Sequence, residues 1–528
     1  METLLHAALL AGLALVLGGV AWGLVVVRGD GPGPARRHCL LLVGLGAAAL
    51  GLGQTVLLAW KTTLLFHLLG HEALAGFVGT PYFGAAAVRA ALALGLTGAV
   101  AWLGRAPAAR ARWSAVAALA VALAVSGAWL SHATSRLEQR GPLMALTVLH
   151  QTAMAVWLGG LVQLIGLSRV ARRHPEVGAA WARVLRRFSA LAAGCVSVLI
   201  LTGALLAWAY VGTTAGLIGS GYGSLIVAKI ILLGVALALA APTAWSIWRR
   251  RPELAAFGAS QRPALVEAEA IVLVMALFTA AGLSAQPPSI DLPAAEHATV
   301  AELVETFRPK TPSLRTPSLG AMRATRVAGQ RSADAYRWSN FSHNVAGLIL
   351  LATSLLALTG VAARRRWAWP QPLGFAALAA FIYLRAAANE GTWPFGAVGL
   401  TQLDSEGLQH RLAAALVLAL GVVEWRARGV RRSSTWLSYV VPGLAAGGAV
   451  LLLAHSHTAF QAKTSFLVQV THTAMGALGA LMVTAQWLEA RLAPAGARLA
   501  SGAAALAMLL VALVLLFYRE ANVVVLSK

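Results

Sequence analysis

Long runs of apolar residues recur along nearly the whole chain, and polar residues gather in the segments between them. A run of about 20 apolar residues spans a bilayer as a helix. No strict alternation of apolar and polar residues occurs, so we expect helices and no strands. The pattern predicts an all-α polytopic membrane protein with about 14 transmembrane helices, at residues 3–27, 38–60, 84–103, 111–132, 143–168, 188–212, 224–249, 264–286, 340–363, 371–388, 407–427, 436–457, 464–488 and 497–519.

One polar segment, residues 287–339, interrupts this pattern and is rich in proline, threonine, serine and arginine. Its composition predicts a mostly extended linker. We therefore expect an eight-helix membrane domain over residues 1–286, an extracytoplasmic linker over 287–339, and a six-helix membrane domain over 340–528.

Two echoes within the first eight helices suggest a parallel 4+4 repeat, because an offset of four helices preserves orientation. In the first echo, Gly79-Thr80-Pro81-Tyr82 followed by Arg89 corresponds to Gly219-Ser220-Gly221-Tyr222 followed by Lys229. In the second, His6 followed by Gly18-Gly19 corresponds to His150 followed by Gly159-Gly160. Chance similarity among Ala-, Leu- and Gly-rich helices is the alternative. The two Tyr–basic pairs have a second interpretation, in which the cations snorkel and anchor helix ends at the interface.

The net charge of +23 is distributed unevenly between the connections of the predicted helices. Every second connection is rich in arginine, and these seven connections hold 25 of the 42 basic residues. This is the positive-inside pattern, which explains the charge without a nucleic-acid partner. It predicts a multi-pass membrane protein with both termini outside the cytoplasm. The N-terminus lacks the basic start of a cleavable signal peptide, so we expect the first helix to be retained.

Histidine is distributed unequally between the two sides of the predicted membrane. Only His38 and His174 of the 13 histidines lie on the cytoplasmic side. Ionisable residues near membrane depth are costly and often mark a site. The outer set is His6, His67, His71, His132, His150, His297, His343, His410, His455, His457 and His472.

Some of these histidines are spaced as ligands on one helix face. His67 and His71 are four residues apart, and so are His150 and Met154; such pairs share a face. Imidazole with thioether suits copper, particularly Cu(I). The candidate metal ligands are His132, His150, Met154, His67, His71, His410, His455, His457 and His472. Taken singly, each histidine could instead be interfacial, and methionine could be a packing residue.

Other polar groups have simpler interpretations. Glu267, Glu269 and Glu424 lie toward the cytoplasmic side, where they could serve an inner exit site, although hydration at helix ends is the simpler account. Cys39 and Cys195 are too few for a disulfide framework. No phosphate-binding loop, zinc-protease motif, haem-attachment motif or nucleophile elbow occurs, so we expect no enzyme.

The run from Leu149 to Leu161, which contains His150 and Trp157-Leu158-Gly159-Gly160, resembles the copper-resistance D (CopD) family. Arg187-Phe188-Ser189, Leu201-Thr202-Gly203 and Gly221-Tyr222-Gly223 fit the same resemblance. The second half resembles the C-terminal extension of longer members, through Trp393-Pro394, Gln409-His410-Arg411, Glu424-Trp425, His455-Ser456-His457 and Trp487-Leu488-Glu489.

The resemblance implies an inner-membrane protein that moves copper, as Cu(I) or Cu(II), from periplasm to cytoplasm in copper homeostasis or resistance. It also implies a small periplasmic copper chaperone as partner. Two alternatives stay open. One is a membrane redox protein that holds b-type haem between paired histidines. The other is a scaffold for periplasmic copper-protein assembly.

Overall fold

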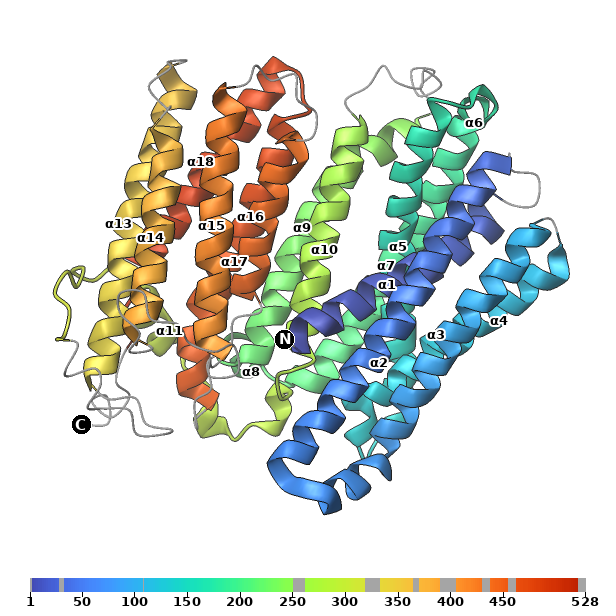
Figure 1. The fold of residues 1–528 in the computed structure, drawn as a ribbon, viewed down its shortest axis with the longest axis horizontal. Coiled ribbons are helices and arrows are strands. Elements are labelled where there is room, and N and C mark those ends of the chain that lie inside the picture. The colour runs from blue at the N-terminus through green and yellow to red at the C-terminus, as the bar shows by residue number, and fades with distance from the viewer. Residues whose placement is uncertain are drawn as a thin grey trace. The chain divides into compact units, whose positions relative to one another are not determined.

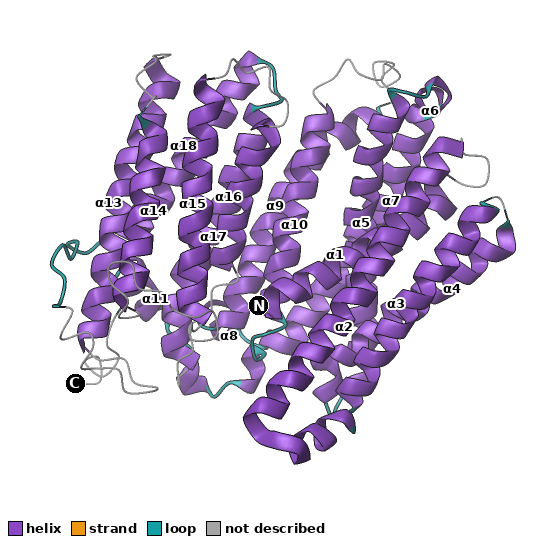
Figure 2. Ribbon diagram, in the orientation of Figure 1, coloured by secondary structure: helices purple, strands orange, loops and turns teal. Residues whose placement is uncertain are grey.

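The computed structural model describes residues 2–27, 33–107, 109–249, 262–318, 333–363, 370–389, 405–429, 437–453 and 462–520. These residues form helices, turns and irregular connections, with no strand among them (Figure 2). The all-α prediction is confirmed. Every one of the 14 predicted segments contains a helix, and 12 of the described helices are long and apolar enough to cross a membrane. The two predicted segments outside that group contain α14 (Gln371–Asn389) and α16 (Leu437–Leu453).

Two compact units make up the chain. The first comprises Met1–Tyr210 and Leu233–Ala285, and the second comprises Val211–Leu232 and Gln286–Lys528. The units therefore do not follow chain order strictly, because residues 211–232 belong with the second. Each unit is described separately below.

The first unit is built mainly from seven long helices. Within it, the α3–α4 turn and α6 lie at one end, and the α2–α3 turn lies at the opposite end (Figure 1). The arginines around α6 and those between α3 and α4 thus share an end, in agreement with the positive-inside pattern. Its helices are α1 (Glu2–Ala21) with its π-helical continuation η1 (Trp22–Val27), α2 (Gly33–Val78), α3 (Pro81–Arg105), α4 (Arg110–Ser126), α5 (Arg140–Ala171), α6 (Pro175–Ala179), α7 (Trp181–Val211), the second half of α9 (Gly221–Trp248) and α10 (Arg262–Leu283).

Glycine allows α1 and α5 to approach closely at the centre of the first unit. A Cβ atom on Gly159 would lie 1.9 Å from the carbonyl oxygen of Ala14, and one on Gly18 would lie 2.5 Å from the Cα of Gly159. A Cβ on Gly160 would meet the ring of Phe188 at 2.4 Å. The glycine pairs of one predicted echo thus meet each other, although the repeat itself stays a prediction.

The second unit contains a six-helix bundle and the linker that precedes it. Leu350, Phe375, Leu420 and Met508 form part of a buried apolar cluster that joins four of these helices. The elements are α8 (Thr214–Ile218), the first half of α9, η5 (Ser289–Asp291), η6 (Ala294–Glu296), α11 (Val300–Phe307), α13 (Ala333–Ala363), α14, α15 (Ser405–Gly429), α16, α17 (Ala462–Glu489) and α18 (Pro494–Leu516).

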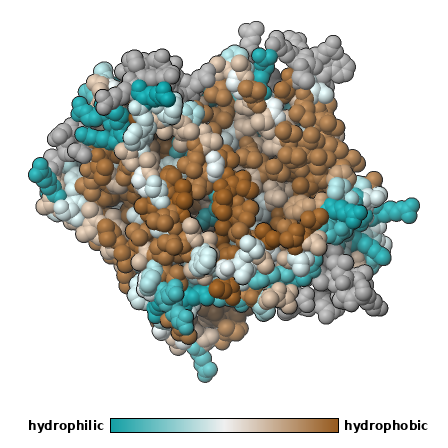
Figure 3. Space-filling view, turned by 180° about the vertical axis from the view of Figure 1, so that it is seen from behind, coloured by the Kyte–Doolittle hydropathy of each residue, from teal (hydrophilic) through white to brown (hydrophobic). Residues whose placement is uncertain are grey.

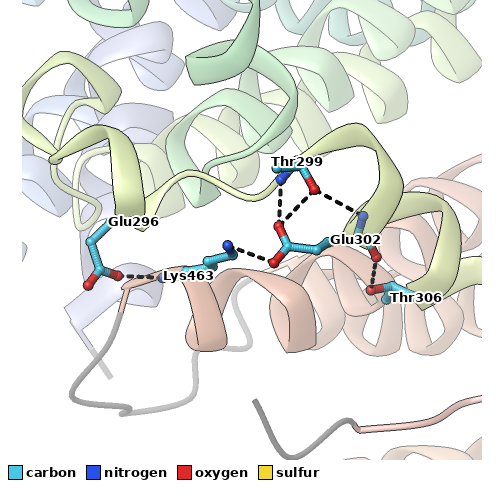
Figure 4. A network of polar contacts seen from close by, with 5 residues as sticks. All are labelled: Glu296, Thr299, Glu302, Thr306 and Lys463. Carbon is cyan, nitrogen blue, oxygen red and sulfur yellow. Dashed lines mark hydrogen bonds and ion pairs between the residues drawn. The ribbon is translucent and has the colours of Figure 1, made fainter. Parts of the chain in front are cut away.

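The linker is folded over much of its described length, so the prediction of a mostly extended segment is wrong there. Thr299 and Glu302 form a capping box that starts α11. The Lys463 ammonium at the start of α17 lies 2.6 Å from Glu302, and the Lys463 backbone N–H donates to Glu296 at 3.0 Å (Figure 4). Local caps and one lysine therefore order a sequence that composition alone assigns to a coil.

Large apolar side chains cover much of the outer surface, as the face in Figure 3 shows. Leu52, Val121 and Leu201 are each more than half exposed although they lie in the middle of long helices. A water-soluble protein rarely exposes a continuous apolar surface of this kind. A bilayer is the environment that this surface fits.

Candidate functional site

One face of α5 carries a stripe of chemically distinct side chains. His150, Met154 and Trp157 are spaced by four and three residues on one continuous helix, so they lie along one face. The stripe runs for roughly 10 Å along the helix axis, at 1.5 Å per residue. The spacing predicted for His150 and Met154 is therefore present in the fold.

His150 is oriented by a neighbouring helix. Its Nδ1 lies 3.1 Å from the Thr202 hydroxyl oxygen on α7. That hydroxyl donates its only hydrogen to the Val198 carbonyl at 2.6 Å, so the His150 Nδ1–H must be the donor to Thr202. In the neutral imidazole the lone pair then sits on Nε2, the form in which histidine binds metals. Gly203 makes room for the ring, since a Cβ there would lie 3.1 Å from His150 Cε1.

The inner end of the stripe meets a buried carboxylate. The Trp157 indole N–H donates to Glu269 on α10 at 2.9 Å. Trp157 is 1% exposed and Glu269 is 5% exposed. The interpretation of Glu269 as a hydrated residue at a helix end is therefore wrong. A carboxylate buried at membrane depth is costly and is usually retained for function.

His132 lies in the short 3-10 helix η3 (His132–Ser135), beyond the end of α4. Its ring centroid is 6.4 Å from that of Tyr210 at the end of α7. The Arg136 guanidinium lies 5.3 Å from the same Tyr210 ring. His132 is half-buried, and the Tyr210 ring beside it also contacts Arg136.

The predicted pair His67 and His71 does not share a regular helical face. Gly70 between them has φ 78° and ψ −168°, which kinks α2 there. Both rings contact Phe66, at centroid distances of 5.7 and 4.8 Å, and both histidines are exposed. Glycine adopts this positive φ without a steric cost, and the i,i+4 geometry is lost as a result.

Arg89 is buried rather than snorkelling, so its interpretation as an interfacial anchor is wrong. It is 5% exposed and donates to the Leu123 carbonyl at 3.0 Å, where α4 ends. Gly127 permits this position, because a Cβ there would lie 2.7 Å from Arg89 and 3.2 Å from the Gln151 side chain. Arg89 therefore lies close to the residue that follows His150.

The two segments of the predicted repeat that precede Tyr82 and Tyr222 begin their helices with similar hydroxyl caps. The Thr80 hydroxyl accepts from the Phe83 backbone N–H at 3.2 Å, and the Ser220 hydroxyl accepts from the Gly223 backbone N–H at 2.9 Å. Lys229 is half-buried.

In the second unit, the predicted ligand His472 lies in a polar cluster. It is 4% exposed, and its ring is 5.6 Å from that of His343 and 6.1 Å from that of Tyr518. Met475 is buried one turn further along α17. His343 was counted among the outer histidines but was missed as a candidate ligand.

Three predicted ligands remain, and only one of them lies among the described residues. His410 is half-buried on α15, whereas His455 and His457 lie outside the described residues. Within the described part of the chain, no group of three or more His, Cys, Asp or Glu side chains is arranged to hold a metal ion. A metal site among these residues would therefore need another kind of ligand, such as the methionine of the α5 stripe.

One segment of the chain matches a known protein family. Residues 182–283 match the model of the family described as copper resistance protein D, CopD. This segment is similar to the CopD family. No curated protein and no solved structure matches the chain.

The CopD match covers most of α7, all of α8 and α9, and α10. It therefore includes Thr202 and Glu269, the two groups that contact the α5 stripe. His150 and Trp157 lie outside the matched residues. The similarity to copper resistance protein D over these residues agrees with the membrane-spanning character of the helices.

Proposed function

We propose that this protein moves copper ions across the bacterial inner membrane, from the periplasm to the cytoplasm, and thereby serves copper homeostasis or resistance. The family match supports copper as the cargo. The gathering of histidines on the predicted outer side supports capture from the periplasm. A small periplasmic chaperone would supply the ion.

The α5 stripe is the observation that carries this proposal. The Nε2 lone pair of His150 would accept the ion, and the Met154 thioether lies about one turn further along the same face. Imidazole and thioether are ligands that suit Cu(I). Beyond them, Trp157 holds the Glu269 carboxylate in place. A cation that advances along this face would meet the buried carboxyl oxygens of Glu269 deeper in the unit.

Tautomer control gives His150 the stronger claim among the candidates of the first unit. The Thr202 hydroxyl fixes which ring nitrogen is free of hydrogen. Groups that orient a metal-binding histidine in this way typically contribute 10–100-fold in affinity or activity. His67 and His71, on either side of the kink at Gly70, lack the common face expected of them.

A pair of histidine variants tests the proposal in cells. His150→Ala should lower copper accumulation at matched membrane expression, because one ligand of a small site is lost. His174→Ala is the control, since His174 is a half-buried residue paired with Glu176 at 3.3 Å; we expect no effect. Equal accumulation in both variants would refute the route through α5.

Spectroscopy on the purified protein separates the other functions. A transporter of Cu(I) should show no Soret absorption, whereas b-type haem bound between histidines would. Wild-type cells that accumulate less copper than cells without the protein would contradict inward movement.

A further inference from the structure

The outer end of α13 presents a polar face to the end of α18. Asn340, His343 and Asn344 are spaced by three and one residues, so they share one side of the helix. The Asn344 amide donates to the carbonyls of Leu515 and Tyr518, and Asn340 accepts from the Glu520 backbone N–H at 2.7 Å. Both asparagines are buried. These bonds fix the segment after α18 and hold Tyr518 beside His343.

His343 and His472 have the same tautomer, and backbone carbonyls determine it. His343 Nδ1 lies 2.8 Å from the Ser339 carbonyl oxygen, and His472 Nδ1 lies 3.0 Å from that of Val468. A carbonyl oxygen only accepts hydrogen bonds, so Nδ1 carries the hydrogen in both rings. The Nε2 atom of each neutral ring is then the nitrogen with the lone pair. Metal-binding histidines are commonly oriented by this Nδ1–H to carbonyl bond.

The two rings are close enough to share one ion. Their centroids are 5.6 Å apart at an interplanar angle of 83°, and imidazole nitrogens bind metal ions at about 2 Å. Tyr518 stacks on His343 with centroids 4.0 Å apart and a tilt of 28°, so it helps to hold that ring. We propose that His343 and His472 form a metal site in the second unit that binds Cu(I) through two imidazole nitrogens.

The two ligands favour a small monovalent soft ion at this site. Two neutral imidazoles bring no negative charge to offset a divalent ion, and imidazole suits copper. The site is separate from the α5 stripe in sequence and in ligands. Only the choice of copper over another soft ion rests on the proposed function.

Stoichiometry in the purified full-length chain tests the site. The apoprotein in detergent is titrated with Cu(I) against a coloured Cu(I) chelator under reducing conditions. His343→Gln and His472→Gln should each bind one equivalent of Cu(I) less than wild type. The double variant should also bind only one equivalent less. His297→Gln is the matched control. His297 uses the opposite nitrogen, because its Nε2 contacts the Ser289 carbonyl at 3.1 Å, and the variant should keep every equivalent.

Rescue distinguishes ligation from a structural role. A double variant with His343→Cys and His472→Cys should regain the equivalent, because thiolates also bind Cu(I). Should the glutamine variants fail to fold, X-ray absorption of the His150→Ala protein still decides: copper with two nitrogen neighbours at about 2 Å is expected at the second-unit site. Full stoichiometry in both folded glutamine variants, or the absence of such a nitrogen shell, would overturn the proposal. If both proposals hold, His150→Ala lowers copper accumulation but keeps the equivalent of Cu(I) bound at His343 and His472. If His150→Ala leaves accumulation unchanged while the glutamine variants lose that equivalent, the proposed route fails and the second site stands.

Discussion

The indole of Trp157 donates a 2.9 Å hydrogen bond to the carboxylate of Glu269, and the two residues lie 112 positions apart in the sequence. Both side chains are buried within the first unit. The bond links the Trp-Leu-Gly-Gly run of α5 to the segment that matches CopD. It gives a physical role to a tryptophan that the sequence presents only as part of a motif.

Two substitutions separate the structural and functional roles of this pair. Trp157→Phe removes the donor and leaves a buried carboxylate without the indole, which should cost about 1–3 kcal/mol of stability. Glu269→Gln keeps an oxygen acceptor for the indole, so its unfolding temperature in detergent should stay near that of wild type while copper accumulation falls. Wild-type accumulation by Glu269→Gln would make Glu269 a structural residue only.

Close packing of α1 on α5 should make Gly159 intolerant of any side chain. In Gly159→Ala the new Cβ would lie 1.9 Å from the Ala14 backbone oxygen, so the helices must separate. Overpacking of this kind typically costs about 1–3 kcal/mol. Thermal unfolding should therefore occur at a lower temperature. Gly98→Ala is the control, because nothing lies within 4 Å of a Cβ there; an equal loss in both variants would contradict the packing argument.

The helices could be predicted from sequence because each apolar run must satisfy its own backbone hydrogen bonds in the bilayer. Apolar content does not reveal where such a helix bends. The apolar pattern places the end of the second helix at residue 60, whereas α2 continues to Val78 and bends at Gly70, whose φ is 78°. The expected face shared by His67 and His71 failed for that reason.

Only the parts of the candidate site that lie close together in the sequence could be predicted. The i,i+4 pair of His150 and Met154 is encoded within one helix, and the fold keeps it. Contacts between distant residues had no such signal, so Glu269 was interpreted as hydrated. His343 was missed as a ligand in the same way, although the polar face it shares with Asn340 and Asn344 at the start of an apolar helix was a usable signal.

The attachment of the linker to α17 should weaken in acid. Burial alone would raise the pKa of Glu302, but hydrogen bonds from Lys463 and Thr299 outweigh it and hold that pKa below its usual value. The bond to Lys463 therefore stabilises the folded linker above the unfolded pKa of about 4.3, and this stabilisation is lost as pH falls through the lower folded value. Because both side chains are partly exposed, we expect a contribution of about 0.2–1 kcal/mol.

Fluorescence anisotropy measures this attachment directly. A fluorophore on Val304→Cys, an exposed position of α11, should report high anisotropy at pH 7 and lower anisotropy near pH 3. Adding Glu302→Gln should lower the value at pH 7 and remove most of the pH response. An unchanged pH response in that variant would show that another group controls the linker.

The Thr202 hydroxyl should control copper affinity through the tautomer of His150. Thr202→Val keeps the branched shape but removes the acceptor of the Nδ1–H bond, so Nε2 no longer retains the lone pair preferentially. We expect Cu(I) affinity at the α5 stripe to fall about 10–100-fold, with little change in unfolding temperature. Thr202→Ser keeps the hydroxyl and should bind nearly as wild type. Thr279→Val is the control, because the Thr279 hydroxyl is buried and donates to the Met275 carbonyl, within α10. Competition with a Cu(I) chelator gives the affinities, and equal affinities for Thr202→Val and Thr279→Val would show that Thr202 does not act through His150.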